Sequence, residues 1–254
     1  MTAIAAPSRR MPRVATSTAA RLLATAVLAL ASAAAVASEW QHEFTPYLWG
    51  SGMDGAVTIG PVRADVDVGF SDILDNLEMG FMGSYRASRD RWSIMVDAMY
   101  MGLGATGTTD RGLASADVDV DQTSLEADLG YAVTEHLTVV GGLRYVDLSA
   151  DIAFDLLRRG TTVEESRSWV DPVIGLVATV PAGERWSFSA RTDVGGFGIG
   201  SELAWQVLVA ARYQLTDRVT LVAALRRVDT RYEARDFVYD VAASGPGLGI
   251  TTRF

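Results

Sequence analysis

The sequence of 254 residues contains no cysteine and no lysine, and it has only two histidines. The absence of cysteine excludes disulfides, thiolate nucleophiles and cysteine-ligated metal centres. All 22 basic residues are arginine, so a Schiff-base lysine and a lysine-bearing phosphate loop are excluded too. The net charge of −9 argues against nucleic acid as a partner, because such binding depends on cationic side chains at phosphates. With 49% apolar residues, the composition is that of a folded protein.

Residues 1–37 have the pattern of a secretory signal peptide. Four arginines precede an uncharged run at residues 22–37, and Ala35 and Ala37 provide the small residues of a cleavage site. The alternative is an N-terminal membrane anchor, but a spanning helix needs about 20 apolar residues and this run is shorter. Cleavage would remove four arginines and no acid, which takes the net charge from −9 to −13. The mature chain is then residues 38–254.

Segments of the mature chain alternate apolar and polar residues with a period of two, as half-exposed strands do. Residues 92–100 and 186–194 show the alternation most clearly. The pattern predicts ten strands, at residues 41–49, 77–87, 92–103, 117–133, 137–149, 169–180, 186–194, 202–215, 219–230 and 245–254.

Tight turns and longer links alternate along the chain between these strands. The predicted turns are residues 88–91, 134–136, 182–185 and 216–218, and the predicted links are residues 50–76, 105–116, 155–168, 195–200 and 231–244. This layout is typical of a bacterial outer-membrane barrel with short periplasmic turns. We expect an all-β fold, a transmembrane antiparallel up-and-down β-barrel of about ten strands.

Aromatic residues gather at the ends of the predicted strands next to the tight turns. They share the parity of the apolar face and predict a belt at the membrane interface: Trp40, Tyr85, Trp92, Tyr131, Trp186 and Tyr213. In the alternative, a soluble sandwich, aromatic core residues would not concentrate at one set of turns.

The last residues resemble the assembly signal of outer-membrane barrels, an alternating strand closed by an aromatic residue. Leu248, Ile250 and Phe254 carry this resemblance, although Thr252 matches it poorly. The resemblance implies the barrel-assembly machinery as a partner, beside outer-membrane lipid and lipopolysaccharide.

Two further motifs, PYLW at residues 46–49 and FSDILDNL at residues 70–77, resemble those of a group of proteobacterial barrel proteins. That group brings no established activity or site residues, so the resemblance implies location and fold only. From the residues themselves we expect a short helix with Ser71 as N-cap. Ile73, Leu74 and Leu77 would form its apolar stripe.

The inward face of the predicted barrel carries seven acids and six arginines, so the lumen is almost neutral. A charge in a narrow lumen needs a partner, and this predicts an ion-paired filling. The candidates are Asp97, Glu126, Asp128, Arg144, Asp171, Arg191, Asp193, Arg212 and Arg226. Ten strands enclose little more than side chains, so we expect a plugged or very narrow lumen. The alternative is a polar conduit whose ion pairs rearrange.

The surplus of acids lies in the long links. Asp117, Asp119 and Asp121 approach a calcium-loop pattern, but Gln122 stands where that loop needs glycine. The intervening valines indicate a strand with all three carboxylates on one face. We expect no cofactor and no resident metal; the alternative is weak divalent bridging to lipopolysaccharide phosphates at these acidic links.

Three roles agree with this pattern: a structural barrel, an adhesive barrel and a narrow pore, with a small ion or solute channel as the nearest alternative. An outer-membrane enzyme is a further alternative, which the histidines disfavour. His42 opens the first strand and His136 lies in a predicted periplasmic turn, so neither can meet an exterior serine and aspartate in a catalytic triad.

The signal peptide leads to a direct test. N-terminal sequencing of the protein from the outer-membrane fraction should begin within a residue or two of Ser38, because the small residues before it favour cleavage there. Finding Met1 on the membrane-bound protein would contradict this prediction.

Overall fold

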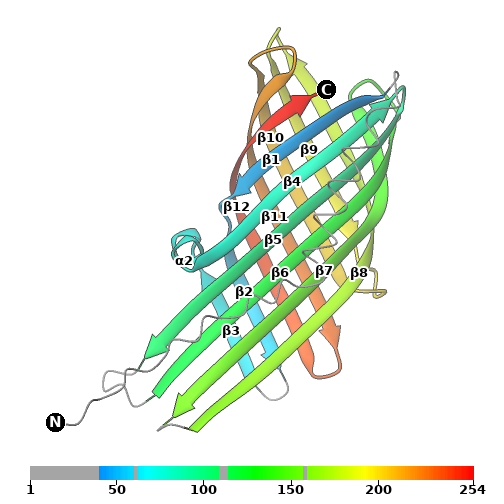
Figure 1. Ribbon diagram of the computed structural model, residues 1–254. Coiled ribbons are helices and arrows are strands. Elements are labelled where there is room, and N and C mark those ends of the chain that lie inside the picture. The colour runs from blue at the N-terminus through cyan, green and yellow to red at the C-terminus, as the bar shows by residue number, and fades with distance from the viewer. Residues whose placement is uncertain (1–39, 60–61, 109–113, 157–158) are drawn as a thin grey trace, which may run out of the picture. The chain divides into compact units, whose positions relative to one another are not determined.

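The computed structural model describes residues 40–59, 62–108, 114–156 and 159–254, and most of them lie in strands (Figure 1). The signal segment lies outside these residues, so its cleavage stays a prediction. The strands are β1 (Gln41–Trp49), β2 (Gly52–Ile59), β3 (Val62–Val68), β4 (Leu77–Arg89), β5 (Trp92–Thr108), β6 (Ala114–Ala132), β7 (Leu137–Leu156), β8 (Arg159–Ala182), β9 (Trp186–Gly195), β10 (Leu203–Gln214), β11 (Val219–Ala234) and β12 (Phe237–Arg253). A six-residue helix, α2 (Phe70–Asp75), precedes β4.

Ten of these strands close into an antiparallel barrel, which confirms the predicted fold. Each of β4 to β12 pairs with its neighbour in the chain, and β1 closes the wall by pairing with both β4 and β12. Closure removes sheet edges from the lipid, where an unpaired backbone group is costly. Within the described residues, no helix combines the length and the apolar character needed to cross a membrane.

Strands β5 to β8 are longer than the sequence pattern indicated. They have 17, 19, 20 and 24 residues, whereas a tilted strand crosses a bilayer with about 9–11. Most described residues of the links predicted at 105–116, 155–168 and 231–244 belong to strands, so those loop predictions were wrong. Figure 1 shows β5 to β8 continuing past the other strands at the end opposite the C-terminus.

The link predicted at residues 50–76 was also wrong in part, because it contains the hairpin β2–β3 in addition to the expected helix, α2. β2 continues β1 along β12 in one unbroken register, from Glu43 opposite Arg253 to Ile59 opposite Phe237. The junction is tight, since a Cβ on Gly245 would overlap the carbonyl oxygen of Gly50. Residues 62–68 alternate apolar and polar side chains, but a run of seven residues does not by itself distinguish a strand from a loop.

Helix α2 forms where the sequence predicted a helix, but its N-cap is Gly69 rather than Ser71. The Asp72 carboxylate accepts a hydrogen bond from the Gly69 N–H at 3.2 Å, which satisfies one free donor of the first turn. Ile73 is buried, whereas Leu74 is 55% exposed. The predicted apolar stripe is therefore only partly buried.

The outer face of the wall is apolar at the height of the predicted bilayer. Large apolar side chains there are about half exposed, as lipid-facing residues are in the absence of lipid: Leu129, Leu143, Ile174, Phe188 and Val209. Residues of the opposite parity, such as Arg191 and Asp193 on β9, are buried inside the barrel. Charge inside and apolar surface outside are the reverse of a soluble barrel.

Leu143 lies six residues from the turn that precedes β7, near the expected middle of the bilayer. Leu143→Arg should lower the free energy of unfolding by about 2–4 kcal/mol, because a cation there faces hydrocarbon. Urea unfolding in lipid vesicles measures the change. Glu135→Arg, at an exposed turn residue, is the matched control and should leave stability nearly unchanged. Equal effects of the two substitutions would contradict a lipid-facing wall.

Candidate functional site

The inner face of the barrel carries a network of ion pairs. Its first arginine, Arg144 on β7, donates from Nε to Glu126 Oε2 at 2.6 Å and from Nη2 to Asp193 Oδ1 at 2.8 Å. Glu126 on β6 is the direct cross-strand neighbour of Arg144, whereas Asp193 lies on β9. These side chains are at most 5% exposed. One guanidinium thus joins strands that are not neighbours.

The second arginine, Arg191 on β9, engages the same two acids. Its Nε donates to Asp193 Oδ2 at 2.8 Å, and its Nη2 contacts Glu126 and lies 2.9 Å from Asp128 Oδ2. Because Glu126 and Asp193 each bind both arginines, the four side chains form a closed ring. We call Glu126, Arg144, Arg191 and Asp193 the central ring.

Polar side chains extend the central ring across the lumen to the opposite wall. Gln206 on β10 donates to Asp193 Oδ2 at 2.6 Å and accepts at 3.1 Å from Nε of Arg226 on β11. Arg226 Nη1 lies 3.6 Å from Asp97 Oδ1, and the Tyr47 hydroxyl donates to the same oxygen at 3.0 Å. The connected side chains therefore reach from β6 and β7 to β1 and β11.

Two of the predicted ion-pair residues have other partners. Asp171 is fully buried and faces Arg144 in the strand register, yet its carboxylate accepts from Trp169 Nε1 at 3.2 Å and from the Ser201 backbone N–H at 2.6 Å. Arg144 points instead to the central ring. Asp171 thus anchors the loop before β10, and the structure shows no arginine pairing with it among the described residues. Arg212 approaches Glu43 at 3.8 Å rather than an aspartate.

A second layer of side chains, which the sequence pattern did not predict, fills the lumen on the side away from the tight turns. Trp169 stacks on Tyr232 with ring centroids 4.2 Å apart, and Tyr239 lies beside it at 6.1 Å. Trp169 is 5% exposed, and Met99 and Met101 are also buried. The signal was present in Trp169, which is aromatic at an inward position whose neighbours, Arg167 and Asp171, are polar. Tyr239 lies in the link predicted at residues 231–244, so no inward parity was expected for it. We call this the aromatic layer.

The predicted belt residues lie on the wall beside the tight turns. Trp92 packs against Tyr131 and Trp186 against Tyr213, with centroids 4.9 Å and 4.8 Å apart. Tyr85 instead hydrogen-bonds His42 Nδ1 at 2.6 Å, and Trp40 begins the described chain.

The three residues of the proposed assembly signal lie on or directly after β12. Leu248, Ile250 and Phe254 are exposed on the outer surface, and the Phe254 N–H donates to the His42 carbonyl oxygen at 3.0 Å. Their role in assembly stays a prediction.

The acidic run of β6 lies mostly beyond the apolar band. Asp119 and Asp121 are exposed, and the Tyr100 hydroxyl donates to Asp121 Oδ1 at 2.6 Å; the Asp117 side chain lies outside the described residues. In the part of the chain that the structure describes, no three His, Asp or Glu side chains converge as metal ligands. Divalent bridging stays a prediction.

The architecture of the chain is similar to that of solved outer-membrane proteins. The chain aligns with the outer membrane protease OmpT from Escherichia coli at a TM-score of 0.52 and 9% identity, over 85% of this chain and 97% of the protease. The fold is that of an outer-membrane β-barrel. Ail, the attachment invasion locus protein of Yersinia pestis, aligns at a TM-score of 0.42 and 14% identity, over 85% of this chain and 99% of Ail. No family model and no curated protein sequence matches the chain, so the group suggested by the two motifs stays a prediction.

The central ring leads to a stability prediction. Arg191→Ala should lower the free energy of unfolding by roughly 3–5 kcal/mol, because it leaves buried carboxylates without their partner. Arg185→Ala, in the exposed turn before β9, should change it by about 0.5 kcal/mol or less. Urea unfolding in vesicles compares the two. Equal stability of both variants would show that water reaches the ring freely.

Proposed function

We propose that the protein is a sealed outer-membrane barrel with a structural or adhesive role at the bacterial surface. The central ring is the observation that carries this proposal. Its four side chains are at most 10% exposed and bind one another across the lumen. A continuous water column through the barrel would hydrate these groups, and their burial argues against one.

The aromatic layer supports the same proposal independently. Trp169, Tyr232 and Tyr239 come from β8, β11 and β12, so they close the lumen from several sides of the wall. An ion that crossed the barrel would lose hydration at this layer without gaining charged partners. It would then meet the central ring, where each carboxylate already has a cation. The aromatic layer and the central ring would thus oppose the passage of an ion one after the other, which favours a closed barrel.

The long strands beyond the membrane favour an adhesive role over a purely structural one. β8 has 24 residues, and β5 to β7 accompany it, so a paired sheet extends past the apolar band. Exposed Asp119, Asp121 and Asp151 make its described surface acidic. Such a surface suits cationic partners, or lipopolysaccharide phosphates through divalent ions.

A narrow pore is the second candidate, because cavities lie on both sides of the central ring. Rearrangement of the ring would join them. A catalytic role has less support: His42 is engaged with Tyr85, and His136 lies in an exposed turn at the same end of the barrel. We therefore propose no enzymatic activity.

Planar-bilayer recording separates the sealed barrel from the pore. The purified wild-type protein should give no stable conductance steps. Replacing both Arg144 and Arg191 by alanine should create a small cation-selective conductance, because the remaining network is strongly acidic. Heat-modifiable mobility on gels checks that the variant is folded. Steady conductance of the wild type would overturn the sealed barrel in favour of the pore.

A further inference from the structure

The lumen beside the tight turns carries a surplus of positive charge. Glu43 on β1 stands between Arg86 on β4 and Arg253 on β12, each its direct cross-strand neighbour. Arg212 reaches toward the same glutamate from β10. Arg212 and Arg253 thus share one carboxylate, and Arg86 lies on the strand beside it. The near-neutral lumen is therefore divided by height, with an acidic majority where Asp128 adjoins the central ring and a basic majority at this end.

These arginines are poorly supplied with acceptors compared with those of the central ring. Arg253 binds Glu43 at 2.8 Å, but Arg212 has only two long contacts, 3.8 Å to Glu43 and 3.5 Å to Thr251 Oγ1. Both use Nη2, although a guanidinium has five N–H donors. The Arg86 side chain forms no hydrogen bond or ion pair with another of the described residues. Donors without acceptors in a confined space favour a bound anion.

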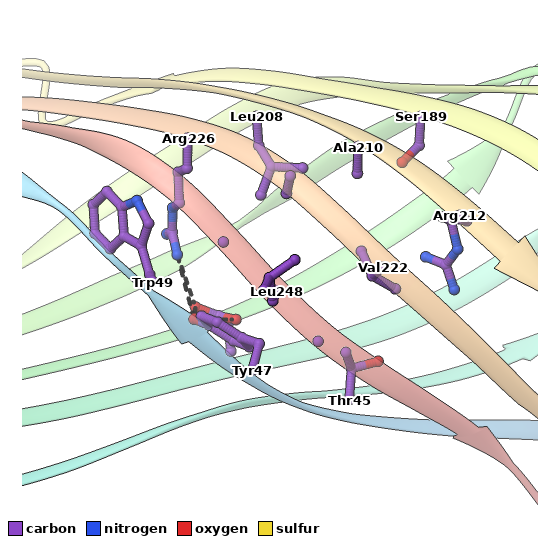
Figure 2. A pocket seen from close by; sticks show the side chains of 14 residues that line it. Thr45, Tyr47, Trp49, Ser189, Leu208, Ala210, Arg212, Val222, Arg226 and Leu248 are labelled. Carbon is purple, nitrogen blue, oxygen red and sulfur yellow. Dashed lines mark hydrogen bonds and ion pairs between the residues drawn. The ribbon is translucent and has the colours of Figure 1, made fainter.

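A cavity adjoins these arginines. One part, of about 160 Å³, is lined by Arg86, Glu43 and Arg212, and a neighbouring part of about 150 Å³ is lined mainly by apolar side chains. Figure 2 shows Leu208, Ala210 and Val222 along the apolar part, with Arg212 near one end and Arg226 joined to Tyr47 at the other. Arg212, Leu208 and Asp97 line both parts, so the two parts lie side by side.

The size and lining of the cavity select the class of ligand. An apolar cavity of about 150 Å³ accommodates one benzene ring. The inward glycines of β12, Gly247 and Gly249, leave this space open where other residues would fill it. A guanidinium binds a carboxylate through two parallel hydrogen bonds. Apolar wall and arginine donors therefore match an acid whose carboxylate is attached to a ring-sized apolar body.

We propose that this end of the lumen is a blind-ended binding site for small aromatic or similarly sized apolar carboxylates. The carboxylate binds Arg212 with Arg86 beside it, and the apolar body lies against Leu208, Ala210 and Val222. The ligand enters from the periplasm, because the tight turns lie on that side and the central ring closes the other.

Isothermal titration of benzoate into the purified, detergent-solubilised barrel tests the site. Benzoate should bind, and benzyl alcohol, which has the ring without the charge, should bind at least about tenfold more weakly. Arg212→Gln should weaken benzoate by a similar factor, whereas Arg218→Gln, in the exposed turn before β11, should not change it. Gel mobility confirms that each variant is folded.

A second variant tests the apolar part separately. Ala210→Leu fills the cavity beside Leu208 and should abolish benzoate binding while leaving acetate, which needs only the arginines, unaffected. Equal binding of benzoate and benzyl alcohol, no benzoate binding at all, or unchanged binding by folded Arg212→Gln would each overturn the proposal. A closed barrel and a conducting one can both pass this test, so its failure leaves the sealed-barrel proposal standing.

Discussion

Burial of charge inside a closed wall is the constraint on which the rest of the structure depends. An arginine facing a narrow lumen loses its hydration, and it is stable there only with carboxylates at hydrogen-bond distance. Arg144 and Arg191 meet that condition by sharing Glu126 and Asp193, which ties β6, β7 and β9 together beyond their backbone pairing. The wall supplies closure, and the central ring supplies a rigid interior. Removal of any one member leaves the other three side chains with an unbalanced net charge.

Much of the fold could be predicted because strand geometry is periodic. Alternation along residues 186–194 assigns Phe188 to lipid and Arg191 to the lumen without knowledge of any neighbour, and the structure agrees. The tight turns next to aromatic residues likewise predicted one end of the barrel, and the assignment of that end to the periplasm stays a prediction. The prediction of strand ends from alternation failed in β5 to β8. Alternation continues past the membrane in these strands, and a period of two does not indicate where lipid stops. The prediction also failed for β2 and β3, which are too short to stand out from a loop.

The pairing inside the lumen could not be predicted from parity alone. Arg144 and Asp171 are direct cross-strand neighbours, yet the arginine turns to Glu126 and Asp193 while Asp171 holds the Ser201 backbone. An arginine side chain reaches across two strands, so several carboxylates compete for it, and local backbone donors compete for the carboxylates. The height of each charge depends on the stagger of the strands, which no single segment contains. Hence the separation of acidic and basic layers emerged only in three dimensions.

The hairpin β2–β3 lengthens one side of the barrel without changing its circumference. β2 prolongs β1 against β12 in the same register, and in the described chain β3 pairs only with β2, so it ends the sheet. Because β1 and β2 occupy the same position beside β12, the hairpin adds no strand to the ten-stranded ring. The wall is closed along β1, where β4 and β12 both pair with it, and becomes an open sheet along β2, with β3 as its edge strand.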